Sequence, residues 1–417
     1  MILDMTSAMF WSRETLPNGL TLLLFPRETA NTTQLSVSVG FGSNQEPEEN
    51  AGVAHFIEHM LAGGSTKRIQ LSRSTEDSGG ILDFYTDHEH MMTTMDILPE
   101  KLTEASNVIS ELLFNTEFEE KNFKKERKII LNELSEALDD PSERIEELLL
   151  KTLFKNHPLK RPVGGFPKTV EKLTLNQLEQ THRTNYISQN MVLILTGSFT
   201  EKSVEGVLEN FKNRTKEQTF LRKMVPCETA KPQSRVVEKK PGIAQSYLSI
   251  GAQTVCSSHQ DSPKLDLMSA LLSGGTSSRL FVELREKNAL TYDVSCDHNK
   301  GVDFGYFSIS CAVKNRKLGK ATELIFKELS KLRTDKVPKE ELDRNKNLIM
   351  AEILRGMDNP HECSEILAYM EMQFRTETAL VDYIGKIKAV SSEDIMEAAN
   401  RYLQEDSLTT VTLKATK

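Results

Sequence analysis

The chain has 417 residues, more than one ordinary hydrophobic core holds, which indicates two or three domains. Hydrophobic residues make up 38% and charged residues 27%, the balance of a soluble protein with many exposed helices. The net charge of -8, with Lys and Arg interleaved with Glu and Asp, argues against a partner that is a nucleic acid.

The cysteines and the start of the chain bear on its compartment. The cysteines are Cys227, Cys256, Cys296, Cys311 and Cys363. Their odd number and wide spacing favour reduced thiols over a disulfide framework. Residues 1–13 lack the basic start and apolar core of a secretory signal, and no apolar run is long enough to cross a bilayer. We therefore expect a cytoplasmic protein without a membrane span.

Apolar periodicity and Gly or Pro breaks predict the elements of the first half. In chain order we expect strands at 20–25 and 34–41, helices at 50–61 and 69–78, strands at 81–86 and 90–97, helices across 99–154, an irregular loop at 157–167, a helix at 174–186, a strand at 191–196 and a further helix. Residues 213–241 are polar and carry three prolines, so we place a linker at 216–241.

The second half repeats this order of elements. We expect strands at 246–252 and within 291–313, with a turn at 298–301, helices at 262–273, 277–287, 315–333, 338–357, 361–373 and 392–404, and a last strand at 408–413. The repeat predicts an α+β protein of two homologous domains, 1–215 and 242–417, each a mainly antiparallel sheet flanked by helices.

Residues 54–61, Ala-His-Phe-Ile-Glu-His-Met-Leu, carry the clearest chemistry. His55, Glu58 and His59 fall on one face of the predicted helix, with apolar side chains on the other. Two neutral imidazoles can bind one metal ion, and the carboxylate between them can hold and deprotonate a water molecule on that metal. The order H-x-x-E-H is the inverzincin motif. The competing interpretation is two surface histidines on an ordinary helix, because chance also produces this pattern.

A catalytic zinc usually has three protein ligands, so a third is needed. Glu126 and Glu133 are two helical turns apart and project from nearly the same face. One could bind the metal while the other hydrogen-bonds a histidine. Glu136, one turn further, fits as well, and a merely solvated acidic face is the alternative. Two nitrogens, one oxygen and a water suit one zinc ion per chain, although cobalt or manganese could replace it in vitro.

These residues resemble the pitrilysin family of zinc metallopeptidases, and most closely its half-length branch, which includes the mitochondrial processing peptidase. The similar segments also include Leu16-Pro17-Asn18-Gly19-Leu20, His157-Pro158-Leu159 and Asn190-Met191-Val192. The resemblance implies that His55, His59 and Glu133 bind zinc, that Glu58 is the catalytic base, and that Glu126 supports the site from behind the ligands.

The second half carries another marker of this family. Arg285 and Tyr292 are seven residues apart, and in active members such a pair contacts the substrate backbone and the oxyanion. Without the resemblance, Arg285 would be a surface helix charge and Tyr292 a half-buried strand residue.

The sequence departs from the family pattern on the edge strand that is expected to hold the substrate by β-augmentation. Asp83 and Phe84 stand where the family often has Asn-Ala, so side-chain contacts with the substrate are expected to differ.

The expected function is that of a zinc endopeptidase acting on peptides or unfolded segments inside a closed chamber. The resemblance implies a clamshell homodimer in which each site is completed by the other chain, or a heterodimer with a paralogue. The rival from another class is a non-catalytic scaffold or chaperone-like subunit, which typically has a degraded metal motif. A third possibility is an enzyme devoted to one biosynthetic peptide.

Overall fold

The computed structural model describes residues 11–63, 65–212, 224–225 and 234–416. The chain forms two compact units. Unit 1 comprises the described residues within 1–135, 161–223 and 354–381, and unit 2 comprises those within 136–160, 224–353 and 382–417. Each half of the chain therefore contributes one segment to the unit that the other half mainly builds.

Unit 1 contains a six-stranded mixed sheet. Its strands are β1 (Ser12–Thr15), β2 (Thr21–Pro26), β3 (Thr33–Val39), β4 (Ile81–Thr86), β5 (Met91–Ile97) and β6 (Met191–Gly197). They lie in the order β1-β2-β6-β3-β5-β4, with β2 and β6 parallel and all other neighbours antiparallel. The order leaves β4 at one edge of the sheet.

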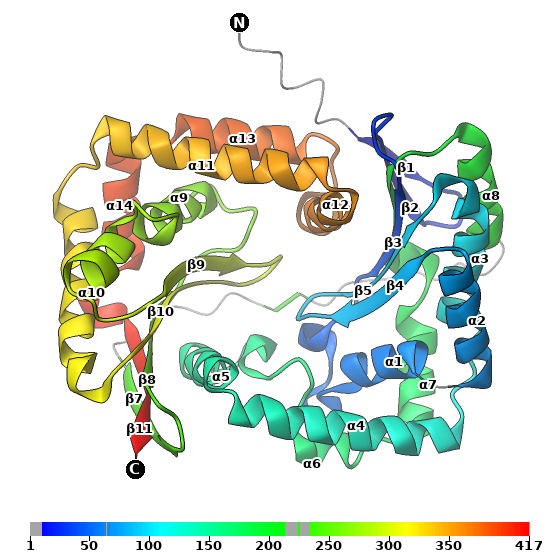
Figure 1. Ribbon diagram of the computed structural model, residues 1–417, viewed down its shortest axis with the longest axis horizontal. Coiled ribbons are helices and arrows are strands. Elements are labelled where there is room, and N and C mark those ends of the chain that lie inside the picture. Colours follow the sequence, from blue (N-terminus) through cyan, green and yellow to red (C-terminus); the bar gives the residue numbers. More distant parts are fainter. Residues whose placement is uncertain (1–10, 64, 213–223, 226–233, 417) are drawn as a thin grey trace, which may run out of the picture. The chain divides into compact units, whose positions relative to one another are not determined.

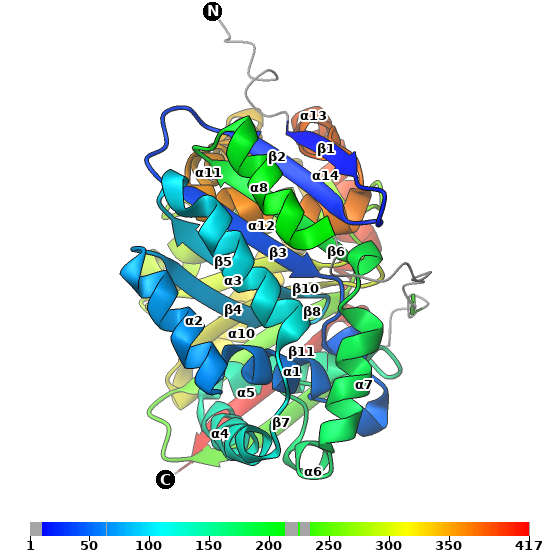
Figure 2. The same ribbon diagram turned by 90° about the vertical axis from the view of Figure 1, so that its right-hand side faces the viewer.

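Helices cover both faces of this sheet. They are α1 (Val53–Ala62), α2 (Thr66–Asp77), α3 (Leu102–Asn115), α4 (Glu120–Asp139), α6 (Pro167–Val170), α7 (Leu175–Asn185), α8 (Glu201–Lys212) and α12 (Pro360–Phe374). Figure 1 shows α2, α3 and α8 on one side of the sheet and α12 on the other, and Figure 2 shows α3 and α8 lying across the strands. The apolar residues of β3 join the core that α1 and α3 close.

The alternating strand β3 is buried on both faces. Leu35, Val37 and Val39 point into the apolar core. Their polar neighbours face α12: Ser36 Oγ donates to Ser364 Oγ at 3.1 Å, and Ser38 Oγ lies 3.6 Å from a methionine sulfur of that helix. A helix from the second half of the chain thus completes the first sheet.

Unit 2 repeats the topology with five strands. They are β7 (Ser234–Pro241), β8 (Ser246–Gln253), β9 (Val294–Lys300), β10 (Gly305–Val313) and β11 (Thr409–Thr416), in the order β7-β11-β8-β10-β9. The pair β7 and β11 is parallel and the other neighbours are antiparallel, as in the order β2-β6-β3-β5-β4 of unit 1. The predicted α+β fold of two similar domains is confirmed.

Helices also cover both faces of the second sheet. They are α5 (Pro141–Leu153), α9 (Ser262–Ser273), α10 (Leu318–Thr334), α11 (Lys339–Asp358), α13 (Ala379–Ala389) and α14 (Ser392–Tyr402). Figure 1 shows α9, α10 and α14 on one side and α5 on the other. Helix α5 packs on β8 and β11: Gln253 Nε2 donates to the carbonyl of Leu153 at 2.7 Å, and a Cβ atom at Gly251 would lie 3.0 Å from the Leu149 side chain.

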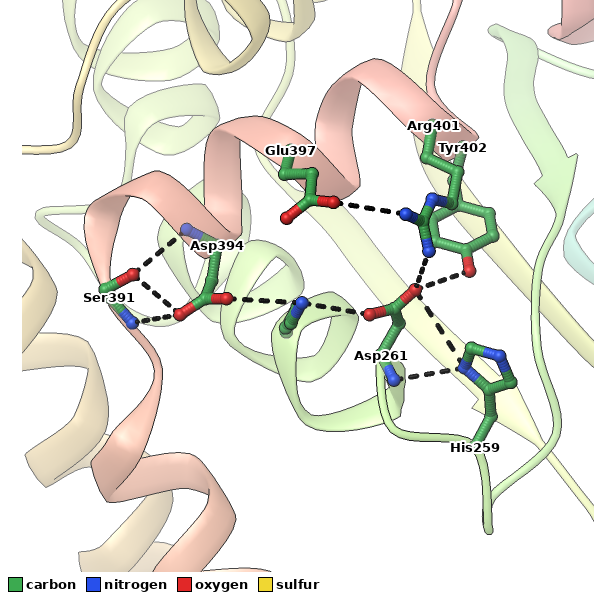
Figure 3. A network of polar contacts seen from close by, with 8 residues as sticks. His259, Asp261, Ser391, Asp394, Glu397, Arg401 and Tyr402 are labelled. Carbon is green, nitrogen blue, oxygen red and sulfur yellow. Dashed lines mark hydrogen bonds and ion pairs between the residues drawn. The ribbon is translucent and has the colours of Figure 1, made fainter.

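A charged network joins α9 to α14 in unit 2 (Figure 3). The buried carboxylate of Asp261 accepts from Arg401 at 2.7 Å and from the Tyr402 hydroxyl at 2.8 Å, and Lys264 lies 3.0 Å away. Lys264 also reaches Asp394, 3.2 Å distant, at the start of α14. These donors offset the cost of burying the charged carboxylate, and they hold the pKa of Asp261 below its usual value.

Several details of the sequence-based prediction are wrong. Residues 234–241 were placed in the linker but form β7, because their alternate side chains are half buried and the strand pairs with β11. The rest of the predicted linker lies almost wholly outside the described residues. The turn between β9 and β10 is at 301–304 rather than 298–301, the predicted helix at 277–287 is a π-helix at Phe281–Lys287, and α13 was missed.

The predicted division into 1–215 and 242–417 stays a prediction about domains, and the exchange of α5 and α12 between the units is an additional finding. Among the described residues, no helix combines the length and apolar character that a membrane crossing requires.

Candidate metal centre

The buried apolar face of helix α1 fixes the position of the H-x-x-E-H residues. Phe56, Ile57 and Leu61 are fully buried in the core of unit 1, so the opposite edge of the helix carries His55, Glu58 and His59. The helix begins after Gly52, whose φ of +96° is open to glycine but strained for other residues. The predicted helix and its orientation are both found.

A buried glutamate that sequence reasoning missed anchors the start of α1. The two carboxylate oxygens of Glu46 accept from the backbone N–H groups of Gly52 (2.9 Å) and Ala54 (2.7 Å). Burial raises the pKa of Glu46 to about 8, while these two donors and the nearby Arg161 oppose the shift. Arg161 also donates to the Glu46 carbonyl at 3.0 Å. The only sequence signal was an acidic residue in the loop before the helix.

Helix α4 brings two carboxylates to His59. Its Nε2 atom lies 3.2 Å from Glu133 Oε2, and its Nδ1 atom lies 3.4 Å from Glu126 Oε2. Glu126 is 3% exposed, whereas the Glu133 side chain is 44% exposed. One ligand atom each from His55, His59 and Glu133 lie within 4.8 Å of one another. Among the described residues Glu136 does not join this group, so the structure separates two glutamates that spacing alone left equivalent.

The residues fit a zinc ion. Two imidazole nitrogens and one carboxylate oxygen form a known donor set for catalytic zinc, and they leave a further position open. The His55 and His59 rings lie 4.6 Å apart, nearly perpendicular to each other. Burial and the neighbouring His59 lower the pKa of His55 to about 4, so His55 is neutral near pH 7, the form that binds metals. The buried Nδ1 atom of His55 has no partner in the described structure.

Glu58 lies beside these ligands with a perturbed carboxyl group. Its Oε2 atom is 4.0 Å from His55 Nε2. Burial raises the pKa of Glu58 to about 7; His59 opposes this shift, and the charges of Glu133 and Asp83 add to it. A carboxyl group with its pKa near neutrality is suited to accept and release a proton.

The edge strand β4 places Asp83 close enough for its charge to act on Glu58. Asp83 is exposed, and its Oδ1 atom accepts from the backbone N–H of Phe84 at 2.9 Å. Phe84 is only partly buried and packs against the apolar core of unit 1, 5.4 Å from the guanidinium of Arg68. The two residues therefore have different surroundings: Asp83 is open to solvent and Phe84 packs on the core, while their contact with a substrate stays a prediction.

Arg285 and Tyr292 lie together in unit 2. Arg285 Nη1 donates to the Tyr292 carbonyl at 2.9 Å, and the guanidinium is 4.3 Å from the centre of the Tyr292 ring. Tyr292 is 80% exposed and precedes β9. The alternative of a half-buried strand tyrosine is wrong, because this ring projects into solvent and carries its hydroxyl with it.

Comparison with known proteins bears on both halves of the chain. The family model described as "Insulinase (Peptidase family M16)" matches residues 23–166, and the one described as "Peptidase M16 inactive domain" matches residues 172–349. The second description agrees with the sequence of α9, which follows the same strand in unit 2 as α1 does in unit 1 and has no histidine.

Several relatives match the chain over nearly its whole length. An uncharacterized zinc protease of Bacillus subtilis is 25% identical over 94% of this chain and 96% of its own length. A probable β subunit of the mitochondrial processing peptidase from Arabidopsis thaliana is 25% identical over 94% of this chain and 76% of its own. The crystal structure of a protease from Helicobacter pylori, 22% identical, superposes with a TM-score of 0.90 over 97% of this chain and 99% of that one.

Proposed function

We propose, given that the chain belongs to the pitrilysin or M16 family of peptidases, that it is a zinc endopeptidase that cleaves peptides or unfolded segments. The observation that supports this most is the convergence of His55, His59 and Glu133 beside Glu58. A degraded metal motif would favour a scaffold, and here every residue of the motif is in place.

The proposed ligands are His55, His59 and Glu133, with one zinc ion per chain. Bound zinc supplies a Lewis acid that polarises the scissile carbonyl and lowers the pKa of a water molecule. Glu126 accepts from His59 Nδ1, which fixes the tautomer that leaves Nε2 free toward Glu133. Its burial keeps this contact away from solvent.

Glu58 is the proposed general base and acid. It takes the proton of the attacking water and then gives it to the leaving amine, so the carboxyl group ends as it began. The substrate lies along β4, where backbone pairing does not depend on side chains. Asp83 replaces an amide with a carboxylate beside this strand, so it can accept from a substrate N–H group but cannot donate to a substrate carbonyl.

Arg285 and Tyr292 are proposed to stabilise the oxyanion. The exposed Tyr292 hydroxyl and the guanidinium packed against its ring are available to a substrate. Resemblance to half-length members implies that a second copy, or a paralogue, supplies this pair to each zinc site. We further propose a closed chamber and a cytoplasmic location, the latter supported by the free thiols of the described cysteines.

Metal content and cleavage of one unstructured peptide test the proposal. We expect one zinc per chain, cleavage that stops with a chelator and returns with zinc, and no cleavage by Glu58→Gln. Glu136→Gln, an exposed glutamate on the same helix as Glu133, is the matched control and should cleave normally. A metal-free chain that is inert with added zinc contradicts the enzyme and favours the scaffold.

A mixing experiment tests completion of the site by a second copy. Glu58→Gln and Arg285→Ala chains should each be inactive alone, and mixed dimers should regain part of the activity because one of their two sites is intact. Dimers that exchange subunits without any recovery would contradict sharing between chains.

A further inference from the structure

A cavity of about 480 Å³ lies within unit 2, where α9 packs on β9. Three elements line it, and Figure 1 shows them next to one another. They are α9, the edge strand β9 and α11, and Tyr383 of α13 completes the wall. The order of elements along the chain makes them the counterparts of α1, β4 and α4, which build the metal centre of unit 1.

The ends of α1 and α9 match each other. Each helix is followed by a pair of glycines, Gly63-Gly64 and Gly274-Gly275. In each case the N–H of the first glycine donates four residues back, to the carbonyl of His59 at 2.6 Å or to that of Ala270 at 2.7 Å. Alignment on these glycines gives the three motif residues counterparts in α9, namely Asp266 for His55, Ser269 for Glu58 and Ala270 for His59. The order H-x-x-E-H of α1 thus corresponds to D-x-x-S-A in α9.

Helices α4 and α11 also match. Both have 20 residues and end at an aspartate. Each is followed by a capping residue and by the proline that begins the next helix, Asp140-Pro141 or Asn359-Pro360. Counted back from these ends, Glu352 takes the place of the proposed ligand Glu133. All four counterparts line the cavity, so it corresponds to the metal centre; they are Asp266, Ser269, Ala270 and Glu352.

The cavity lacks the donors of a metal centre but contains a cation. Among the described residues, no group of three potential metal ligands occurs besides that of unit 1. Lys300 lines the cavity, and its Nζ atom donates to the Asp266 carboxylate. Lys300 holds the place of Thr86 in unit 1, since each residue ends its strand before a four-residue turn, 301–304 or 87–90. The long side chain of Lys300 therefore reaches the residue that replaces His55.

The ammonium group of Lys300 is held inside the cavity. The side chains of Lys300 and Asp266 are 13% and 12% exposed. The Asp266 carboxylate also accepts from His298 Nδ1 and from the Tyr383 hydroxyl, each at 2.7 Å. Burial alone would raise the pKa of Asp266, but Lys300 and His298 hold it below its usual value. Burial lowers the pKa of His298, so near pH 7 this ring is neutral and Lys300 supplies the positive charge.

The charge is needed because a buried carboxylate without a counter-charge is costly. In unit 1 a bound metal ion would supply it, and in unit 2 the edge strand supplies it as an ammonium group. We propose that the unit 2 cavity is a second copy of the metal centre, in which the ammonium group of Lys300 occupies the place of the metal ion and excludes one. The comparison with a metal rests on the ligands proposed for unit 1, whereas the cation of unit 2 rests on the contacts of Lys300.

Zinc content of a rebuilt site tests the proposal without any turnover. The variant Asp266→His/Ser269→Glu/Ala270→His restores H-x-x-E-H to α9, and Glu352 is already present. With Lys300 in place we expect one zinc per chain, bound in unit 1, because the ammonium group repels a second ion. Adding Lys300→Thr should raise the count to two. Adding Lys239→Thr instead, which changes an exposed lysine of β7, is the matched control and should leave it at one.

The same variants in a His55→Ala background, which disrupts the metal centre of unit 1, report on unit 2 alone. The expected counts are then no zinc with Lys300 in place and one zinc with Lys300→Thr. Circular dichroism shows whether each variant is folded.

A second experiment needs no change in α9. Lys300→Ala removes three methylene groups and the ammonium group, which together have the shape of n-propylammonium. We expect this variant to melt about 10 °C lower than the native chain, because the Asp266 carboxylate loses its counter-charge. Added n-propylammonium should recover several degrees by binding the folded form, whereas n-propanol, which is neutral and of equal length, should not. The native chain and Lys239→Ala should respond to neither.

Three results would overturn the proposal. A second zinc in the rebuilt variant that keeps Lys300 would mean that the ammonium group does not exclude a metal. A count of one in the folded variant with Lys300→Thr would mean that the cavity is not a copy of the metal centre. An equal response of Lys300→Ala to n-propylammonium and n-propanol would mean that the cavity does not hold a cation, and this result decides if the rebuilt variant does not fold. A native chain without zinc would refute the ligands of unit 1, while rescue by n-propylammonium would leave the cation of unit 2 standing.

Discussion

Glu126→Gln is the sharpest test of how the metal centre is held together. Glu126 Oε2 lies 3.4 Å from His59 Nδ1, while His59 Nε2 faces Glu133 at 3.2 Å. The substitution keeps the size of the side chain and one acceptor but removes the negative charge that polarises the imidazole. It also adds an NH₂ group, which cannot accept from His59 if the amide turns.

The expected loss follows from the indirect role of this contact. Changing a group that orients a metal-binding histidine typically lowers metal affinity by about 10–100-fold, or about 1.4–2.7 kcal/mol. Loss of a ligand should cost more, so we expect zinc affinity in the order native, Glu126→Gln, Glu133→Gln. At saturating zinc, Glu126→Gln should recover much of its activity, whereas Glu133→Gln should not.

Competition with a chelating zinc indicator measures the dissociation constants, and circular dichroism of the metal-free chains shows that the fold is kept. Glu136→Gln, which changes an exposed glutamate on the same helix, should have native zinc affinity. If Glu126→Gln binds zinc as tightly as the native chain, the contact with His59 does not support the site. If Glu136→Gln weakens binding as much, the ligand assignment on α4 is wrong.

Three further predictions concern chemistry and stability. Glu58→Gln should lower kcat by at least about 10²-fold because it removes the proton acceptor, yet retain one zinc per chain; normal turnover would exclude Glu58 as the base. Burial lowers the pKa of both His55 and His182 to about 4, so in the metal-free chain their contribution to stability is full above pH 6.5 and is lost as the pH falls toward 4, up to about 3 kcal/mol each. Urea unfolding of the native chain and of His182→Gln at pH 7 and pH 4.5 measures this loss for His182, because the raised pKa values of Glu46 and Glu58 change the stability of both chains in the opposite direction. A native chain that loses no more stability than His182→Gln would contradict the prediction. Gly52→Ala should destabilise the chain by about 2 kcal/mol or more, because φ is +96° and the new Cβ would lie 2.5 Å from the Gly164 carbonyl oxygen; an unchanged melting temperature would contradict this strain.

The sequence was sufficient for features that depend on local spacing. The orientation of His55, Glu58 and His59 follows from the period of one helix, and α1 has the predicted face. The third ligand was different, since Glu126, Glu133 and Glu136 all satisfy helical spacing. Only the packing of α4 against α1 distinguishes them, and the helical periodicity of either segment does not predict how the two pack together.

Other features were missed because their partners are remote in the chain. The polar sequence at 234–241 forms a strand because β11, more than 160 residues later, pairs with it. Glu46 has no pattern of its own and becomes important only because the N–H groups of α1 point at it. The apolar periodicity of α5 and α12 predicts that each helix packs on an apolar surface, but it does not indicate which of the two sheets provides that surface.

The exchange of α5 and α12 has a practical consequence for dissecting the protein. A cut within 213–233 would yield an amino-terminal fragment without the helix that covers Ser36 and Ser38, and a carboxy-terminal fragment without the helix that covers Gly251. Each fragment alone would therefore be prone to aggregate, and the pair should be soluble only when co-expressed. A single unit should therefore be expressed together with its exchanged helix, α12 for unit 1 or α5 for unit 2, rather than cut at the middle of the chain.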